Sequence, residues 1–156
     1  MDVYVWLSRC DAGAFADFVA RYVDTRNPGD ERLSAFLRAY VTGGAGDADR
    51  AAIADLRRDD DSGGAFSLYL NARHHDGAVI TVTREGAAVL GLTLDDPDDS
   101  AEVEGRARAL VDRLRAEFAA AAGCAGTELP PAHSRQEWEA DGLVRFRVGE
   151  LPRASR

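Results

Sequence analysis

The stretch from residue 65 to residue 94 places the strongest constraint on how this chain can fold. It holds three short segments in which apolar and polar side chains alternate, separated by two loops that each end in an acidic residue and a glycine. Such alternation is typical of a β-strand with one buried face. The pattern therefore predicts an antiparallel meander of three strands, AFSLYLNA (65–72), AVITVT (78–83) and AAVLGLTL (87–94).

The lengths of the two loops follow from the requirement that apolar faces meet. Residues directly opposite in a hairpin point to the same face, so a two-residue turn in either loop would set an apolar face against a threonine face. Three-residue loops instead place Leu70 opposite Val82, and Val82 opposite Ala88. The last residue of such a loop adopts a left-handed conformation, which glycine favours. We therefore expect that conformation at Gly77 and Gly86.

The other elements are predicted from hydrophobic spacing and from capping residues. The apolar run 3–7 carries bulky side chains on both faces, which is typical of a strand inside a sheet. Apolar residues at helical spacing predict three helices before the meander and a longer one after it. The helices are expected at 12–24 with Asp11 as the cap, at 28–41 after the pair Asn27-Pro28, at 47–58, and at 100–121 with Asp99 or Ser100 as the cap; a last strand is expected at 143–148.

This order, β-α-α-α-β-β-β-α-β, defines the predicted fold class. It is typical of an α+β protein with a mostly antiparallel sheet of about five strands and helices packed on it. One domain is expected over residues 1–150, followed by a disordered tail at 151–156. The segment 127–142 is interpreted as irregular, with Trp138 either exposed or folded back into a groove.

Charge and composition exclude several classes of protein. The chain has 27 acidic residues against 19 basic ones and a net charge of −8, so we expect no binding to nucleic acid or to anionic lipid. No basic leader and no run of 18 apolar residues is present, which predicts no membrane association and a cytoplasmic location. The two cysteines, Cys10 and Cys124, lie far apart without ligand spacing, so no metal and no cofactor is expected.

The sequence also lacks a recognisable catalytic signature. The stretch RHHDG (73–77) holds two of the three histidines, but neighbours on a strand point to opposite faces, so His74 and His75 are not expected to bind one metal. We expect His74 to cover the edge of the core. No nucleophile-elbow serine and no phosphate-binding loop is found, and the absence of these motifs favours a binding protein over an enzyme.

One face of the predicted sheet carries the candidate binding residues. Aromatic and arginine side chains together are the usual composition of binding hot spots. The alternative is that a helix covers this face and that its aromatic residues belong to the core. The candidates are Tyr4, Trp6, Tyr69, Asn71, Arg73, Thr81 and Thr83, which Arg145 and Arg147 would join if their strand lies nearby.

Two hypotheses on function are compatible with these features. The first is a non-catalytic protein-interaction domain that binds a basic protein partner, as a bacterial immunity protein or antitoxin-like inhibitor binds a basic toxin. This hypothesis rests on size and acidity. The alternative is a small-molecule-binding domain or small enzyme with a pocket between sheet and helices, where Arg73, Tyr69 and His74 would supply polar groups. A homodimer formed through the sheet is a third arrangement that the sequence allows.

Overall fold

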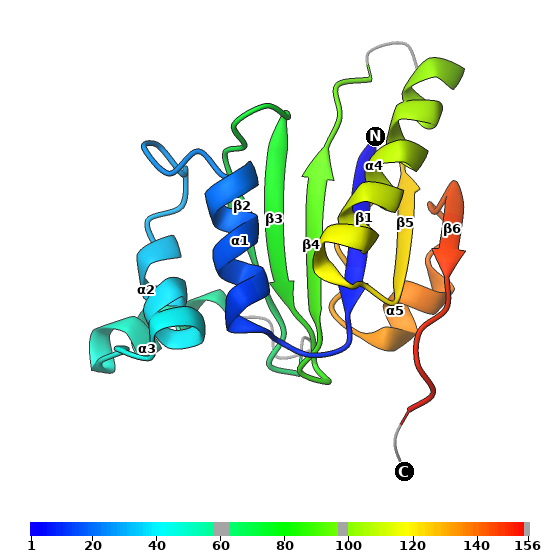
Figure 1. Ribbon diagram of the computed structural model, residues 1–156. Coiled ribbons are helices and arrows are strands. Elements are labelled where there is room, and N and C mark those ends of the chain that lie inside the picture. Colours follow the sequence, from blue (N-terminus) through cyan, green and yellow to red (C-terminus); the bar gives the residue numbers. More distant parts are fainter. Residues whose placement is uncertain (58–62, 97–99, 155–156) are drawn as a thin grey trace.

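The computed structural model describes residues 1–57, 63–96 and 100–154, and these form one antiparallel sheet with helices on both faces (Figure 1). Six strands lie in the order β2-β3-β4-β1-β5-β6, and every neighbouring pair is antiparallel. The predicted α+β class is confirmed, with one strand more than expected. The strands are β1 (Asp2–Leu7), β2 (Phe66–Leu70), β3 (Gly77–Val82), β4 (Ala88–Thr93), β5 (Ala122–Gly126) and β6 (Phe146–Gly149).

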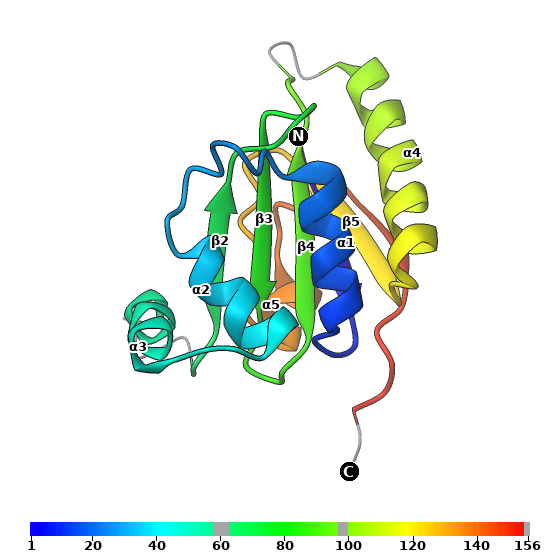
Figure 2. The same ribbon diagram turned by 60° about the vertical axis from the view of Figure 1, so that its left-hand side comes forward.

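The helices divide unequally between the two faces of the sheet. Figures 1 and 2 show α1 and α4 in front of the strands, α2 and α3 beside β2, and α5 behind the sheet. The helices are α1 (Ala12–Tyr22), α2 (Leu33–Leu37), the π-helix η1 (Arg38–Thr42), α3 (Asp47–Leu56), α4 (Ala101–Phe118) and α5 (Arg135–Ala140). None of the helices in the described residues has the length and apolar character that crossing a bilayer requires.

The connections follow a simple scheme. Leaving β1, the chain forms α1, the helices α2, η1 and α3 and the edge strand β2 before it enters β3, which lies two positions from β1 across β4. From β4 it passes through α4 to β5, which lies two positions away across β1. Two such split β-α-β units make the ferredoxin-like arrangement of strands, here extended by β2 at one edge and β6 at the other. Because α1 and α4 cover one face, the opposite face is left for the segment that follows β5.

The larger core lies between the sheet and the helices α1, α2 and α4. Alternate residues of the strands point into it, and the helices contribute their apolar stripes. Its fully buried side chains include Val3, Val5, Phe15, Phe18, Phe36, Phe66, Leu68, Ile80, Leu90, Leu92 and Leu114. The predicted interior position of the first strand is confirmed, since β1 pairs with both β4 and β5.

The hairpin between β3 and β4 has the predicted register. Val82 lies opposite Ala88, and Gly86 adopts the left-handed conformation with φ of 80°. The backbone N–H of Thr83 donates to the carbonyl of Ala87 at 2.9 Å and closes the loop. This prediction is confirmed because the register depends only on the loop glycine and on the alternation of the two strands beside it.

The predicted register of the first hairpin is wrong by four residues. Leu70 lies opposite Ala78 rather than Val82, so the apolar faces still meet, but the loop is longer than three residues. The chain leaves the sheet at Asn71, whose backbone N–H donates to the carbonyl of Pro28 at 2.7 Å. Gly77 is the first residue of β3 and does not have a positive φ. A contact with a distant loop therefore decides where this strand ends.

The start of α2 differs from the sequence prediction, whereas α4 begins where it was expected. The helix expected at residue 28 begins only at Leu33, because Gly29 has a φ of 88°, which no helix accommodates. Ser100 caps α4, where its hydroxyl accepts from the N–H of Val103 at 3.3 Å. Asp99, the other predicted cap, lies outside the described residues.

The strand that sequence analysis missed is β5, whose sequence AGCAG contains none of the residues that favour strands. Its five residues are all buried between β1 and β6. A Cβ atom at Gly123 would lie 2.4 Å from a methyl group of Val111 on α4. Small residues are therefore needed here so that α4 can pack closely on the sheet.

Candidate functional site

The face of the sheet opposite α1 and α4 is largely covered by the segment that contains α5. Tyr4 and Trp6 project from β1 onto this face, but they are only 5% and 4% exposed. The ring of Trp138 packs edge-on against Trp6 with the ring centres 5.5 Å apart. The alternative in which a helix covers the aromatic residues therefore holds for Tyr4 and Trp6, and these two belong to a second, smaller core.

The segment before α5 is attached to the sheet by hydrogen bonds at Leu129. Its carbonyl accepts from the hydroxyl of Tyr4, and its N–H donates to Asp2 at 2.9 Å. Asp2 also accepts from the hydroxyl of Thr93 at 2.8 Å. Burial, and then the negative charge of Asp2, raise the pKa of Tyr4 well above its usual range, so Tyr4 remains a donor. These hydrogen bonds fix the segment before α5 against the sheet.

A second attachment point joins His133 to the sheet. Its Nε2 lies 2.9 Å from the hydroxyl of Ser67, which in turn lies 2.6 Å from the hydroxyl of Thr81. Glu137 accepts from the backbone N–H of His133 and not from its ring, so the described residues do not form a Ser-His-carboxylate triad here. Thr81 and Thr83 are both buried, and Thr83 accepts from the N–H of Ala87 at 3.0 Å. Both threonines thus have structural contacts and do not form an exposed binding face.

Tyr69 is the aromatic residue of this sheet face that the segment containing α5 leaves exposed. It lies on β2, and 64% of its surface is accessible to solvent. Tyr69 borders a hollow of about 420 Å³ and a second hollow of about 460 Å³, and both also border Pro130 and Pro131. We refer to these two hollows and the residues between them as the Tyr69 groove, defined by Asp2, Tyr69, Glu128, Pro130, Glu137 and Asp141.

The lining of the Tyr69 groove is acidic. Asp2 and Glu128 line the first hollow, and Glu137 and Asp141 line the second. Among the described residues that line the two hollows there is no arginine or lysine, and no ion pair within the described part of the chain includes any of these four carboxylates. Partial burial, and then the charge of Asp2, raise the pKa of Tyr69. The groove can therefore attract a cation and offer it an aromatic face.

The remaining predicted residues divide between the groove and the loop after β2. Asn71 lines the first hollow, and its side-chain amide donates to the carbonyl of Asn27 at 2.9 Å. Arg73 lies beyond the end of the sheet and donates from Nε to the carbonyl of Val23 at 3.0 Å, so it does not share a face with Tyr69. The structure therefore does not bring Arg73, Tyr69 and His74 into one pocket.

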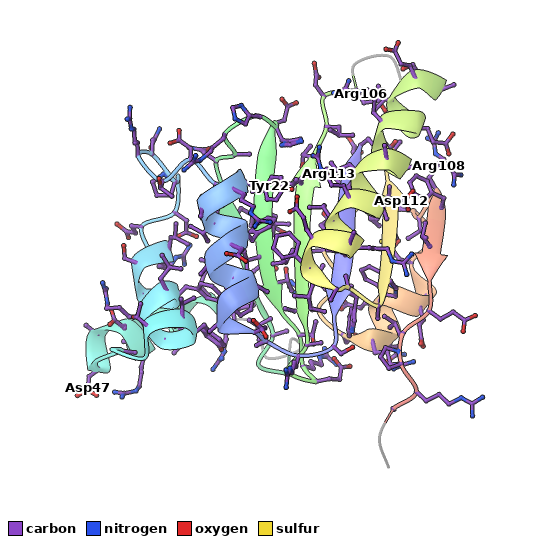
Figure 3. All side chains as sticks on the ribbon, viewed as in Figure 1. Tyr22, Asp47, Arg106, Arg108, Asp112 and Arg113 are labelled. Carbon is purple, nitrogen blue, oxygen red and sulfur yellow. The ribbon has the colours of Figure 1, made fainter. Side chains whose placement is uncertain are left out.

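The histidine that covers the edge of the core is His75 rather than His74. His74 is exposed, whereas His75 is half-buried with its ring 6.2 Å from that of Tyr22. The hydroxyl of Tyr22 donates to Glu117 on α4 at 2.7 Å, and Figure 3 shows Arg113 of the same helix near it. Burial, and then the charge of Arg113, lower the pKa of His75. This cluster ties α1 and the 71–76 loop to α4.

The two arginines of the last strand also have structural contacts. Arg147 donates to the carbonyl of Trp138 at 2.9 Å, at the end of α5, and Arg145 donates to the hydroxyl of Thr127 at 3.4 Å. Leu151 of the tail packs against the second core, while residues 155–156 lie outside the described part of the chain. Arg145 and Arg147 thus help to hold α5 and the segment before it against the sheet.

The cysteines are unsuited to nucleophilic chemistry. Burial raises the pKa of the Cys124 thiol to about 12 and also raises that of Cys10. A thiol that stays protonated at neutral pH is a poor nucleophile. The described residues contain no group of three or more His, Cys, Asp or Glu side chains placed to hold a metal ion.

Sequence reasoning missed the acidic residues of the groove because it treated the segment 127–142 as irregular. A signal was present: Ser134 and Glu137 have the spacing of a capping box, which predicts a helix start. The hydroxyl of Ser134 does cap α5 and accepts from the N–H of Glu137 at 3.1 Å. The proximity of this helix to Tyr69 could not be read from the pattern.

Comparison with known proteins identifies no relative: no family model, no curated sequence and no solved structure matches the chain significantly.

Proposed function

We propose that this chain is a non-catalytic protein-interaction domain that binds a basic segment of a partner protein in the Tyr69 groove. The observation that carries the proposal is an exposed tyrosine that borders two hollows. Four carboxylates line these hollows, and no arginine or lysine does so among the described residues. Tyrosine is enriched in binding hot spots, and a cation over its ring gains about 0.5–1 kcal/mol at an exposed site.

The rigidity of the groove supports this proposal. Tyr69 lies on a strand, and the opposite wall is fixed through Leu129 and His133. A preformed groove orders few side chains on binding and so loses less affinity to entropy. The net charge of −8 would add long-range attraction for a basic partner and raise the association rate at low salt.

The biological setting that we propose is neutralisation of a basic toxin in a bacterial cytoplasm, as an immunity protein or antitoxin would do. Its support is general: a small acidic domain with a docking groove and with no metal-binding cluster in the described residues. The small-molecule alternative has less support, because its three proposed polar residues lie apart.

The proposal is tested by titrating the full chain with a labelled arginine-rich peptide and an acidic peptide of equal length. We expect binding of the basic peptide alone, at low salt, and its loss in Tyr69→Ala and Asp141→Asn. The matched control is Asp112→Asn, which removes the same charge from the exposed face of α4, on the other side of the sheet from α5 (Figure 3). Equal binding by Tyr69→Ala and the natural chain, or equal losses in both aspartate variants, would show that the groove is not the site.

A further inference from the structure

The loop between β2 and β3 carries a histidine in surroundings that suit its neutral form. The ring of His75 lies 6.2 Å from the ring of Tyr22 on α1, and its Nδ1 is buried without a hydrogen-bond partner among the described residues. We propose that His75 is a pH-sensitive switch: the neutral ring holds the 71–76 loop against α1 and α4, and protonation of the ring releases the loop.

The charges that face His75 oppose a positive ring. After burial, which is the largest cause, the charges of Arg113, His74 and Arg106 lower the pKa of His75, in that order. The two arginines come from α4, and His74 precedes His75 in the loop. Asp76 acts in the opposite direction and more weakly. A proton on His75 would therefore add a positive charge to a place that α4 already makes positive.

The carboxylate of Glu117 on α4 already has partners of its own. The hydroxyl of Tyr22 donates to it at 2.7 Å, and Arg21 forms an ion pair with it at 3.5 Å. In a protonated imidazole both nitrogens are donors, so the buried Nδ1 of His75 would lack an acceptor within the described part of the chain. A buried donor costs free energy unless it is paired, and a buried charge costs more. Opening of the loop removes this cost, because water then reaches the ring.

Backbone hydrogen bonds on both sides of His75 close the loop. The N–H of Arg73 donates to the carbonyl of Tyr22 at 2.9 Å, and the N–H of Asp76 donates to the carbonyl of Thr93 at 3.0 Å. An amide in such a bond exchanges its hydrogen with solvent only when the bond opens. The amides of Arg73 and Asp76 therefore report whether the loop is closed.

The loop also adjoins the Tyr69 groove. Its two ends, Asn71 and Gly77, line the first hollow. The switch acts on the free chain, so it does not depend on the proposed function.

The direction of the pKa shift sets the pH range of the switch. An imidazole in an open loop titrates at about 6.5, and the closed loop holds the pKa of His75 below that value. The open loop therefore takes up a proton at a higher pH than the closed loop does. The closed form is most stable above about pH 6.5, and below it the ratio of closed to open loop falls about tenfold per pH unit until the lowered pKa is reached.

The test combines an NMR titration of the three histidine rings with amide hydrogen exchange of the full chain, between about pH 8 and about pH 5. We expect a lower titration midpoint for His75 than for the exposed His74. The protection of the Arg73 and Asp76 amides, corrected for the intrinsic exchange rate, should fall in acid. The fall should be about tenfold for each pH unit by which the midpoint of His75 lies below about 6.5.

Two variants separate His75 from its neighbour. His75→Phe keeps a ring beside Tyr22 that cannot be protonated, so its loop should stay protected in acid. His74→Phe is the matched control and should lose protection as the natural chain does. An acid loss of protection that persists in His75→Phe would overturn the proposal.

The titration of the natural chain tests the switch even if His75→Phe does not fold. A midpoint of His75 equal to or above that of His74 would contradict the proposal. So would a low midpoint together with unchanged protection of Arg73 and Asp76 across the same pH range, because protonation of His75 would then not open the loop.

Discussion

The division of the sheet face into a covered part and an open part makes a sharp prediction about two aromatic residues. Trp138 is 5% exposed and packs edge-on against Trp6, whereas Tyr69 is 64% exposed. Trp138 belongs to the second core, whereas Tyr69 lines both hollows of the Tyr69 groove. Replacing each by alanine should therefore separate stability from binding.

The magnitudes follow from burial. Removing a buried tryptophan side chain costs about 3–5 kcal/mol, through lost apolar contact and through the cavity that remains. A domain of this kind is stable by about 5–15 kcal/mol, so Trp138→Ala should remove a large share of that free energy. An exposed side chain outside such contacts changes stability by about 0.5 kcal/mol or less, which is the expectation for Tyr69→Ala.

The assay is urea unfolding followed by far-UV circular dichroism, with Trp138→Phe as an intermediate variant. We expect a lower midpoint for Trp138→Ala, a smaller shift for Trp138→Phe and no shift for Tyr69→Ala, which instead loses binding of the basic peptide. A cost below about 1 kcal/mol for Trp138→Ala would refute the assignment of a second core beneath α5. A large loss of stability in Tyr69→Ala would refute the assignment of Tyr69 to an open groove.

Three further predictions concern packing, capping and pH. Gly123→Val on β5 should destabilise the protein by about 1–3 kcal/mol, because the new side chain would overlap α4. Gly105→Ala on α4 should stabilise it by about 0.5–1 kcal/mol, because a Cβ there meets nothing within 4 Å. Thermal melting temperatures in the opposite order would contradict this. Asp11→Ala should cost about 0.5–2 kcal/mol in urea unfolding, since its side chain caps α1, and an unchanged midpoint would argue against the cap. Burial, and then a hydrogen bond to a glutamate of α4, raise the pKa of Tyr22 to about 12 from 10.0. The folded protein holds this proton more tightly than the unfolded chain, so the stabilisation is complete below pH 10 and is lost between about pH 10 and 12. Tyr22→Phe should lose less stability than the natural chain over that interval, and an equal loss would contradict the assignment.

Where the controlling interactions are local, sequence reasoning predicted the structure correctly. The loop at Gly86 needs only its own glycine and the alternation on either side, and the register of β3 and β4 is as expected. Asp11 and Ser100 cap their helices because a side-chain oxygen and a backbone N–H lie three residues apart. The α+β class follows from these elements taken together.

Where a distant segment competes, the same reasoning failed. Asn71 was expected to continue a strand, but its backbone pairs with Pro28. The strand β5 has no strand-forming sequence, and it exists because β1, β6 and the close approach of α4 at Gly123 hold it in place. Neither contact leaves a periodic signal in the chain.

The candidate site shows the same division. Strand alternation by itself determined that Tyr4 and Trp6 share one face of their strand and that Tyr69 lies opposite Leu68 and Leu70 on its own, because side-chain direction in a strand has a period of two. That the three share one face of the sheet follows from the pairing of β1, β4, β3 and β2. Only the tertiary structure decided which of them meets solvent. The segment around α5 packs over Tyr4 and Trp6 and stops beside Tyr69. Burial depends on contacts between residues far apart in the sequence, and such contacts are formed only when the chain has folded.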